Sequence, residues 1–109
     1  MFNGQIKYVD ETSYYTPNTY YGHLKMEVEK AILSNSRLSD KVAIVRISKI
    51  ISIHHGVFVD FVRNLKALNT VGAFVDLWLS PVSLEFVCSG LRQIAVERTP
   101  GIFHLSGEN

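Results

Sequence analysis

The sequence has one cysteine, almost no net charge and no long apolar run, and each shortage excludes a class of protein. Cys88 alone can form neither an internal disulfide nor a cysteine-based metal cluster, and its place on the apolar side of a helical pattern predicts a buried, inert thiol. A net charge of +1 argues against binding nucleic acid or an anionic membrane surface by bulk electrostatics. The apolar region 71–88 is interrupted by Asp76, Pro81 and Glu85, so it does not predict a membrane span.

Signals for export and for metal binding are also missing. Residues 1–10 lack the basic segment followed by an apolar one that marks a signal peptide, so we expect a cytoplasmic location. The adjacent His54 and His55 have no accompanying cysteine or carboxylate cluster, which favours an exposed loop over a metal site. The 109 residues, 47% hydrophobic and 19% charged, predict a single globular domain over 1–109.

The spacing of apolar residues predicts helices that alternate with strands. Residues 1–19 are polar and rich in turn-forming residues, so we expect a loop there. Helices are predicted at 20–34, 57–68 and 83–97, and extended segments at 42–47, 71–79 and 102–105. This order predicts an α/β fold with a few mostly parallel strands. The segment 42–47 is apolar except for Arg46, a pattern typical of a strand buried on both faces, which needs neighbours in its sheet.

Tyr21 and Lys25 form the pair of residues with the most chemical content. Four residues apart on a helix, they project from one face. An ammonium beside a phenol favours the phenolate and lowers the phenol pKa from about 10. Such a tyrosine can give a proton to a carbonyl oxygen while a hydride reaches the carbon. Taken alone, the pair favours a half-buried tyrosine with a lysine stem lying across it, because a tyrosine and a lysine often occur four residues apart by chance.

Ordered motifs along the chain carry a family resemblance. They are Phe2-Asn3-Gly4, Tyr8 to Glu11, Pro17 to Lys25 with Glu29 following, Val45 to Ser48, Asp76 with Ser80-Pro81 and Glu85, and Gly101 to Gly107. In this order and spacing they resemble the C-terminal half of an extended short-chain dehydrogenase/reductase, in the dTDP-4-dehydrorhamnose reductase group. The resemblance implies a partial Rossmann-like fold, the C-terminal portion of an NAD(P)-binding doubly wound sheet.

The same resemblance implies a role for particular residues. Tyr21 would donate a proton to the C4 carbonyl of a 4-keto-6-deoxy sugar nucleotide. Lys25 would lower the pKa of Tyr21 and hydrogen-bond the nicotinamide ribose of NADP or NAD. The nicotinamide would be approached by Ser48 and Ile50, and the sugar-nucleotide pocket would be bordered by Asp76, Trp78 and Pro81.

Departures from the family pattern bear on whether this chain catalyses. The glycine-rich dinucleotide loop and the active-site Ser/Thr of the family are absent, so we expect the substrate-side part of the fold, with doubtful cofactor binding and no activity by this chain alone. Thr19 stands where the family has asparagine, and Leu24 where it has Ser/Thr. Leu77 and Leu79 replace a glutamine and a glycine in the pocket segment.

Three functions therefore stay open. The first is NAD(P)H-dependent reduction of a 4-keto sugar nucleotide. The second is a non-catalytic module, which binds a partner chain, acts as a regulatory subunit, or forms a homo-oligomer through an unpaired sheet edge. The third is a split enzyme whose complementary N-terminal half is a separate chain. Trp78 could either stack on a ligand or pack against other side chains. His104 is predicted to be a hydrogen-bonded histidine in the core or at the edge of the sheet.

Overall fold

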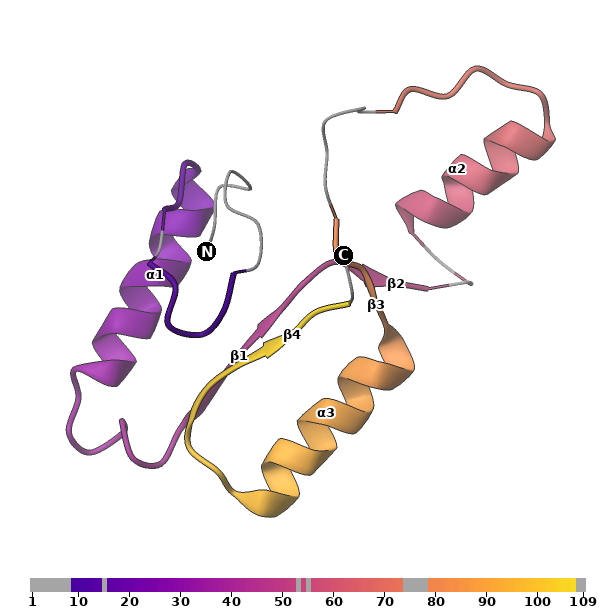
Figure 1. The fold of residues 1–109 in the computed structure, drawn as a ribbon. Coiled ribbons are helices and arrows are strands. Elements are labelled where there is room, and N and C mark those ends of the chain that lie inside the picture. The colour runs from indigo at the N-terminus through magenta and orange to yellow at the C-terminus, as the bar shows by residue number, and fades with distance from the viewer. Residues whose placement is uncertain (1–8, 15, 53, 55, 74–78, 108–109) are drawn as a thin grey trace. The chain divides into compact units, whose positions relative to one another are not determined.

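The fold alternates helices with short strands, in the order that the sequence predicts. The structure, a computed structural model, describes residues 9–14, 16–52, 54, 56–73 and 79–107. Its elements are α1 (Tyr20–Leu33), β1 (Ala43–Ile47), β2 (Ile50–Ile51), α2 (Val57–Lys66), β3 (Val82–Ser83), α3 (Leu84–Glu97) and β4 (Gly101–Leu105) (Figure 1). The α/β class with three helices and short parallel strands is confirmed, and it is consistent with a partial Rossmann-like fold.

The extended segment predicted at 71–79 differs from the structure. Residues 71–73 and 79 lie in neither helix nor strand, and 74–78 lie outside the described residues. The two-residue strands β2 and β3 were not predicted, because so short a run carries no periodicity.

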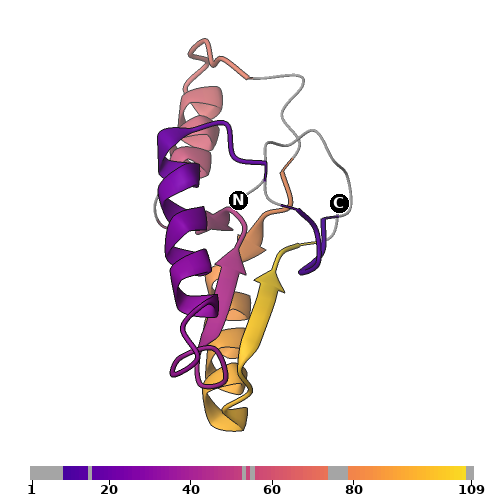
Figure 2. The same cartoon turned by 90° about the vertical axis from the view of Figure 1, so that its left-hand side faces the viewer.

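The strands form two parallel pairs, β1 with β4 and β2 with β3. In the second pair Ile50 lies opposite Val82. In the first, the Gly101 amide donates to the Val42 carbonyl (3.1 Å) and the Ser48 amide donates to the Leu105 carbonyl (3.0 Å). Because both chains advance in the same direction between these two hydrogen bonds, β1 and β4 run parallel (Figure 2).

The chain divides into two compact units, which are described separately. The first unit contains residues 1–46 and 91–104, with α1 and most of β1 and β4. The second contains residues 47–90 and 105–109, with β2, α2, β3 and the first half of α3.

Apolar burial is found in the second unit. Val82 and Val87, with 4% and 3% exposure, are the buried apolar side chains of the described residues. The start of α3 is set by Ser83, whose Oγ accepts from the Phe86 amide at 3.1 Å. Gly90 lies against β4, since a Cβ there would meet Leu105 Cδ2 at 3.0 Å. These contacts fix the first half of α3 to the neighbouring strands.

Side chains of the apolar patterns are less buried than these patterns suggest. Cys88 is exposed, so the prediction of a buried thiol was wrong. On α2, Phe58 and Leu65 retain 39% and 49% exposure, and β1 is half-buried instead of covered on both faces. Periodicity identifies an apolar face but not whether anything covers it. Within the described part of the chain, no helix combines the length and the apolarity that a membrane crossing demands.

Candidate functional site

The start of α1 is built by a cap and a close packing contact. Thr19 is extended, and its Oγ1 accepts from the Gly22 amide at 3.1 Å. Gly22 is buried, and a Cβ there would lie 2.9 Å from Pro17 Cβ. The motif from Pro17 to Gly22 therefore has a structural meaning: a cap, a packed proline and a glycine that leaves room for it. Threonine and asparagine both cap helices, so the departure from the family at Thr19 preserves this function.

The structure brings Tyr21 and Lys25 together on the first two turns of α1. Lys25 Nζ lies over the Tyr21 ring, 5.4 Å from its centroid, which is the geometry of a cation–π contact. Tyr21 is 60% exposed, so it is open to a ligand. Leu24, in the place of the family's Ser/Thr, is 48% exposed. The pair is therefore a surface dyad at the beginning of α1, and its predicted catalytic role stays a prediction.

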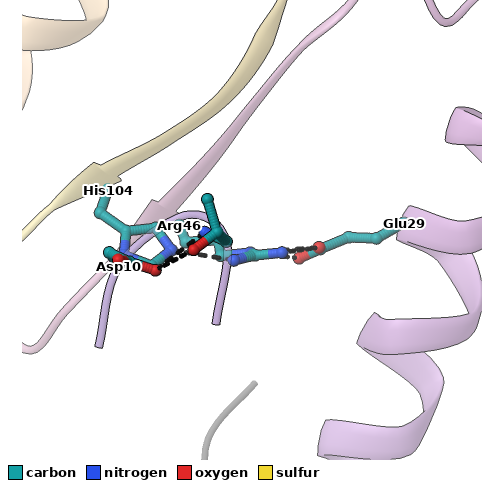
Figure 3. Close-up of polar contacts among 5 residues, drawn as sticks. Asp10, Glu29, Arg46 and His104 are labelled. Atoms are coloured by element: carbon teal, nitrogen blue, oxygen red, sulfur yellow. Dashed lines mark hydrogen bonds and ion pairs between the residues drawn. The ribbon is translucent and has the colours of Figure 1, made fainter. Parts of the chain in front are cut away.

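A half-buried polar network joins α1 to both strands of the β1–β4 pair (Figure 3). Arg46 on β1 donates to the Glu29 carboxylate from Nε (3.1 Å) and from Nη2 (2.8 Å). Its Nη1 lies 2.9 Å from His104 Nε2 on β4. The side chains of Arg46 and Glu29 are only 12% and 13% exposed. This is a two-pronged, charge-assisted contact shielded from water, of the kind that arginine makes best.

The chemistry of the network fixes its hydrogen-bond directions. A guanidinium has no acceptor, so Arg46 donates and His104 Nε2 accepts, which leaves the ring proton of a neutral His104 on Nδ1. The His104 amide in turn donates to Glu11 Oε1 at 2.8 Å. Hydrogen bonds from the Glu11 amide and the His104 amide lower the pKa of the Glu11 carboxyl.

Sequence reasoning treated these residues separately and missed the network. It predicted a hydrogen-bonded His104, which is confirmed, and it assigned no partner to Arg46. The available signal was a polar residue, Arg46 or His104, inside each of two apolar strand patterns. A half-buried charge requires a partner, and the four-residue spacing of Tyr21, Lys25 and Glu29 placed an acid on the matching side of the helix.

Ser48, predicted to approach a nicotinamide, is held by hydrogen bonds in the second unit. Its Oγ donates to the Ser80 carbonyl, and its amide donates to the Leu105 carbonyl at 3.0 Å. Ile50, the other predicted neighbour of the nicotinamide, is 40% exposed. Both predictions stand untested, with Ile50 the more available of the two side chains.

Pro81, predicted to border the sugar nucleotide, is half-buried beside the same hydrogen bonds. The Gly107 amide donates to the Ser80 carbonyl at 3.2 Å, and Gly107 lies so close to the Pro81 carbonyl that a Cβ would overlap it. The turn at Ser80-Pro81 is thereby held from two sides. Asp76 and Trp78, the other predicted pocket residues, lie outside the described residues.

Metal binding finds no support in the part of the chain that the structure describes, where no group of three or more His, Cys, Asp or Glu side chains is placed to hold an ion.

Comparison with protein-family models decides the family. The model described as the RmlD substrate binding domain matches residues 1–109. The chain belongs to this family. It therefore belongs with the sugar-nucleotide reductases that its motifs resemble, and the predicted family is confirmed. Neither the curated proteins nor the solved structures contain a match to the chain.

Proposed function

We propose that the chain carries the proton-donating and sugar-nucleotide-binding part of an NAD(P)H-dependent reductase that acts on a 4-keto-6-deoxy sugar nucleotide. The observation that carries the proposal is the exposed Tyr21–Lys25 dyad, at the capped start of α1, in a chain that matches the RmlD substrate binding domain throughout. Membership of the family supplies the substrate class, and the dyad supplies the chemistry.

The reaction requires one proton and one hydride. NADP or NAD, when bound in reduced form, supplies the hydride. Tyr21 gives its phenolic proton to the C4 carbonyl oxygen as the carbon is reduced, so the products are a secondary alcohol and the oxidised cofactor. The Lys25 ammonium, which already contacts the Tyr21 ring, offsets the negative charge that this transfer leaves on the phenol oxygen.

The described residues fit such a cofactor unevenly. Lys25 is exposed and has three donors, which suits hydrogen bonds to ribose hydroxyls. Ile50 offers an apolar side chain to a nicotinamide ring. Ser48 can offer a cofactor only acceptors, its carbonyl and the lone pairs of its hydroxyl oxygen, because its hydroxyl and amide protons are already donated to Ser80 and Leu105. We accordingly assign the ribose hydroxyls to Lys25.

The test is a reductase assay with matched tyrosine variants, carried out on the holoenzyme, by which we mean this chain together with the dinucleotide-binding half of the reductase and its cofactor. Tyr21→Phe should lower kcat by roughly 10²–10⁴-fold, the usual contribution of a general acid, while the KM for the sugar nucleotide changes little. Tyr20→Phe is the matched control, since Tyr20 is the adjacent residue and is 80% exposed. It should retain kcat within about twofold. Equal losses in both variants, or none in Tyr21→Phe, would reject Tyr21 as the proton donor.

Substrate binding provides a second test that does not depend on turnover. Titration with a dTDP-linked sugar, followed by amide chemical shifts, should perturb residues at the start of α1. Shifts confined to other segments would contradict the proposed role of α1 in binding.

A non-catalytic function as a partner-binding module is the second candidate. It is favoured by the exposed apolar side chains of α2, where Val57, Val62 and Leu65 have 69%, 48% and 49% exposure. Sedimentation of the purified chain tests this candidate. A monodisperse monomer, together with reductase activity in the holoenzyme assay, would favour the first candidate.

A further inference from the structure

The polar network includes Glu29, which lies on the same helix as Tyr21 and Lys25. The network can therefore affect catalysis through the orientation of α1. Tyr21, Lys25 and Glu29 succeed one another at four-residue intervals on α1. At 3.6 residues per turn, Glu29 points within about 80° of Tyr21 and lies roughly 12 Å further along the axis. Whatever holds Glu29 therefore also sets the direction in which the dyad projects.

We propose that Arg46 is a positioning residue, which fixes the rotation of α1 about its own axis through Glu29 and thereby aims Tyr21 and Lys25. This inference rests on the proposed function. It extends that function, because a residue that contacts neither substrate nor cofactor would determine the orientation of the proton donor.

Apolar packing constrains the rotation of α1 only in part, so the ion pair can add to it. Of the apolar side chains on α1, Leu24, Val28 and Leu33 are 48%, 56% and 40% exposed, and Met26 and Ile32 are half-buried. The one buried residue of the helix is Gly22, which has no side chain to direct. Apolar contact is also non-directional, whereas two hydrogen bonds from a planar guanidinium to one carboxylate define an orientation.

His104 fixes the guanidinium in turn. Two nitrogens of Arg46 face Glu29, and the third faces His104 Nε2, so the guanidinium plane is held from both sides (Figure 3). The His104 backbone is held by β4 and by Glu11. The orientation of the Glu29 carboxylate is thus fixed relative to both β1 and β4. A lysine could pair with Glu29 but could not hold both contacts in one plane.

A small rotation is enough to matter. On a helix of radius about 5–6 Å, a turn of about 10° moves a side chain at its surface by roughly 1 Å. Misplacement of a catalytic group by about 1 Å can lower the rate by roughly 10²-fold. Release of Glu29 should therefore reduce kcat without removing any group that meets the substrate.

The experiment replaces the whole pair in the holoenzyme. Glu29→Met/Arg46→Met removes both charges of the pair together, so the variant should fold, with a circular dichroism spectrum like that of the wild type. Its kcat should fall by roughly 10–100-fold while the KM for the sugar nucleotide stays within about threefold. Arg46→Lys should recover only part of this loss. The matched control is Asp60→Met/Arg63→Met, which removes an exposed ion pair of α2 (3.1 Å) and should leave kcat unchanged.

A readout without turnover separates this inference from the proposed function. Residual dipolar couplings of the wild type should fit one alignment tensor for α1, β1 and β4, and in the double variant α1 should need its own tensor. A folded double variant with wild-type couplings overturns the inference, whether or not kcat falls. If the wild-type holoenzyme proves to have no reductase activity, the proposed function fails, while the couplings still decide whether Arg46 orients α1.

Discussion

The two units of the chain are stabilised by opposite means. In the first, the contact shielded from water is polar: Arg46 hydrogen-bonds both Glu29 and His104, and the only buried residue of α1 is Gly22. In the second, the shielded contact is apolar: Val82 and Val87 are buried, and backbone hydrogen bonds hold the Ser80-Pro81 turn beside them. The proposed proton donor is in the unit whose contacts are directional.

This difference indicates what each unit is suited to do. Apolar burial stabilises in proportion to area and tolerates small shifts, whereas a two-pronged ion pair stabilises one orientation only. A unit that must aim a tyrosine benefits from the second kind of contact. We therefore expect substitutions in the first unit to lower the free energy of unfolding most when they leave a charge unpaired. In the second unit, the loss of free energy should increase with the side-chain volume removed.

The largest expected effect follows from removing Arg46 alone. Arg46→Met leaves the Glu29 carboxylate, 13% exposed, without the partner that offsets its desolvation. We expect the free energy of unfolding to fall by about 3 kcal/mol, at the lower end of the range for broken buried pairs. Urea denaturation of the variant and of the wild type measures this difference.

The double substitution gives the control for that prediction. Glu29→Met/Arg46→Met should be within about 1 kcal/mol of the wild type, since replacing a whole buried pair with apolar residues is often neutral. If the single variant were as stable as the double one, the polar network would be no more important to folding than an exposed pair, and the contrast between the units would disappear.

An intermediate effect is expected in the apolar core of the second unit. Val87→Ala removes two methyl groups from a side chain with 3% exposure, so the free energy of unfolding should fall by about 2 kcal/mol. Val96→Ala, on the same helix but 73% exposed, should change it by less than about 0.5 kcal/mol. Thermal and urea unfolding of both variants make the comparison. Equal effects would show that Val87 is not part of a core.

A smaller effect is expected at the cap of α1. Thr19→Ala removes the acceptor of the Gly22 amide and should lower the free energy of unfolding by about 1 kcal/mol. Thr19→Asn, which restores the residue of the family pattern, should return the wild-type stability. Amide hydrogen exchange at Gly22 should quicken in the first variant and not in the second; unchanged exchange in Thr19→Ala would contradict the cap.

The positions of the helices could be predicted because their signals are local. The cap at Thr19, the apolar spacing and the stop at Pro100 lie within or beside the segments they define. The Tyr21–Lys25 contact was predictable for the same reason, since a four-residue spacing on a helix fixes it. The strands β1 and β4 were recognisable by their β-branched or apolar residues.

Burial and pairing could not be predicted, because they depend on residues far apart in the sequence. The partner of Arg46 on β4 lies 58 residues away, and only the register of the two strands brings it to the guanidinium. The exposure of Phe58 and Cys88 depends on whether another element covers them, which periodicity does not report. The contact between Ser48 and Ser80 has no motif at all, since it involves a backbone carbonyl.

The smallest expected effect is the contribution of Glu11 to the stability of the first unit at acid pH. Hydrogen bonds from its own amide and from the His104 amide lower the pKa of the Glu11 carboxyl below the ordinary value of 4.5. Because the folded pKa is the lower one, the stabilisation is present above about pH 4.5 and is lost as the pH falls through the folded pKa. Solvent screens this exposed group, so the contribution should be under about 0.5 kcal/mol.

Glu11→Gln tests this contribution, because the amide oxygen can still accept from His104 but does not titrate over this range. Urea midpoints measured from pH 6 to pH 3 should fall less steeply in the variant, and the two curves should converge at the acid end. Glu11→Asp keeps a charge but is too short to preserve the contact, so it separates charge from geometry. Parallel curves for Glu11→Gln and the wild type would show that the charge of Glu11 does not stabilise the first unit, and the contrast between the units would then depend on the contacts of Arg46 with Glu29 and His104.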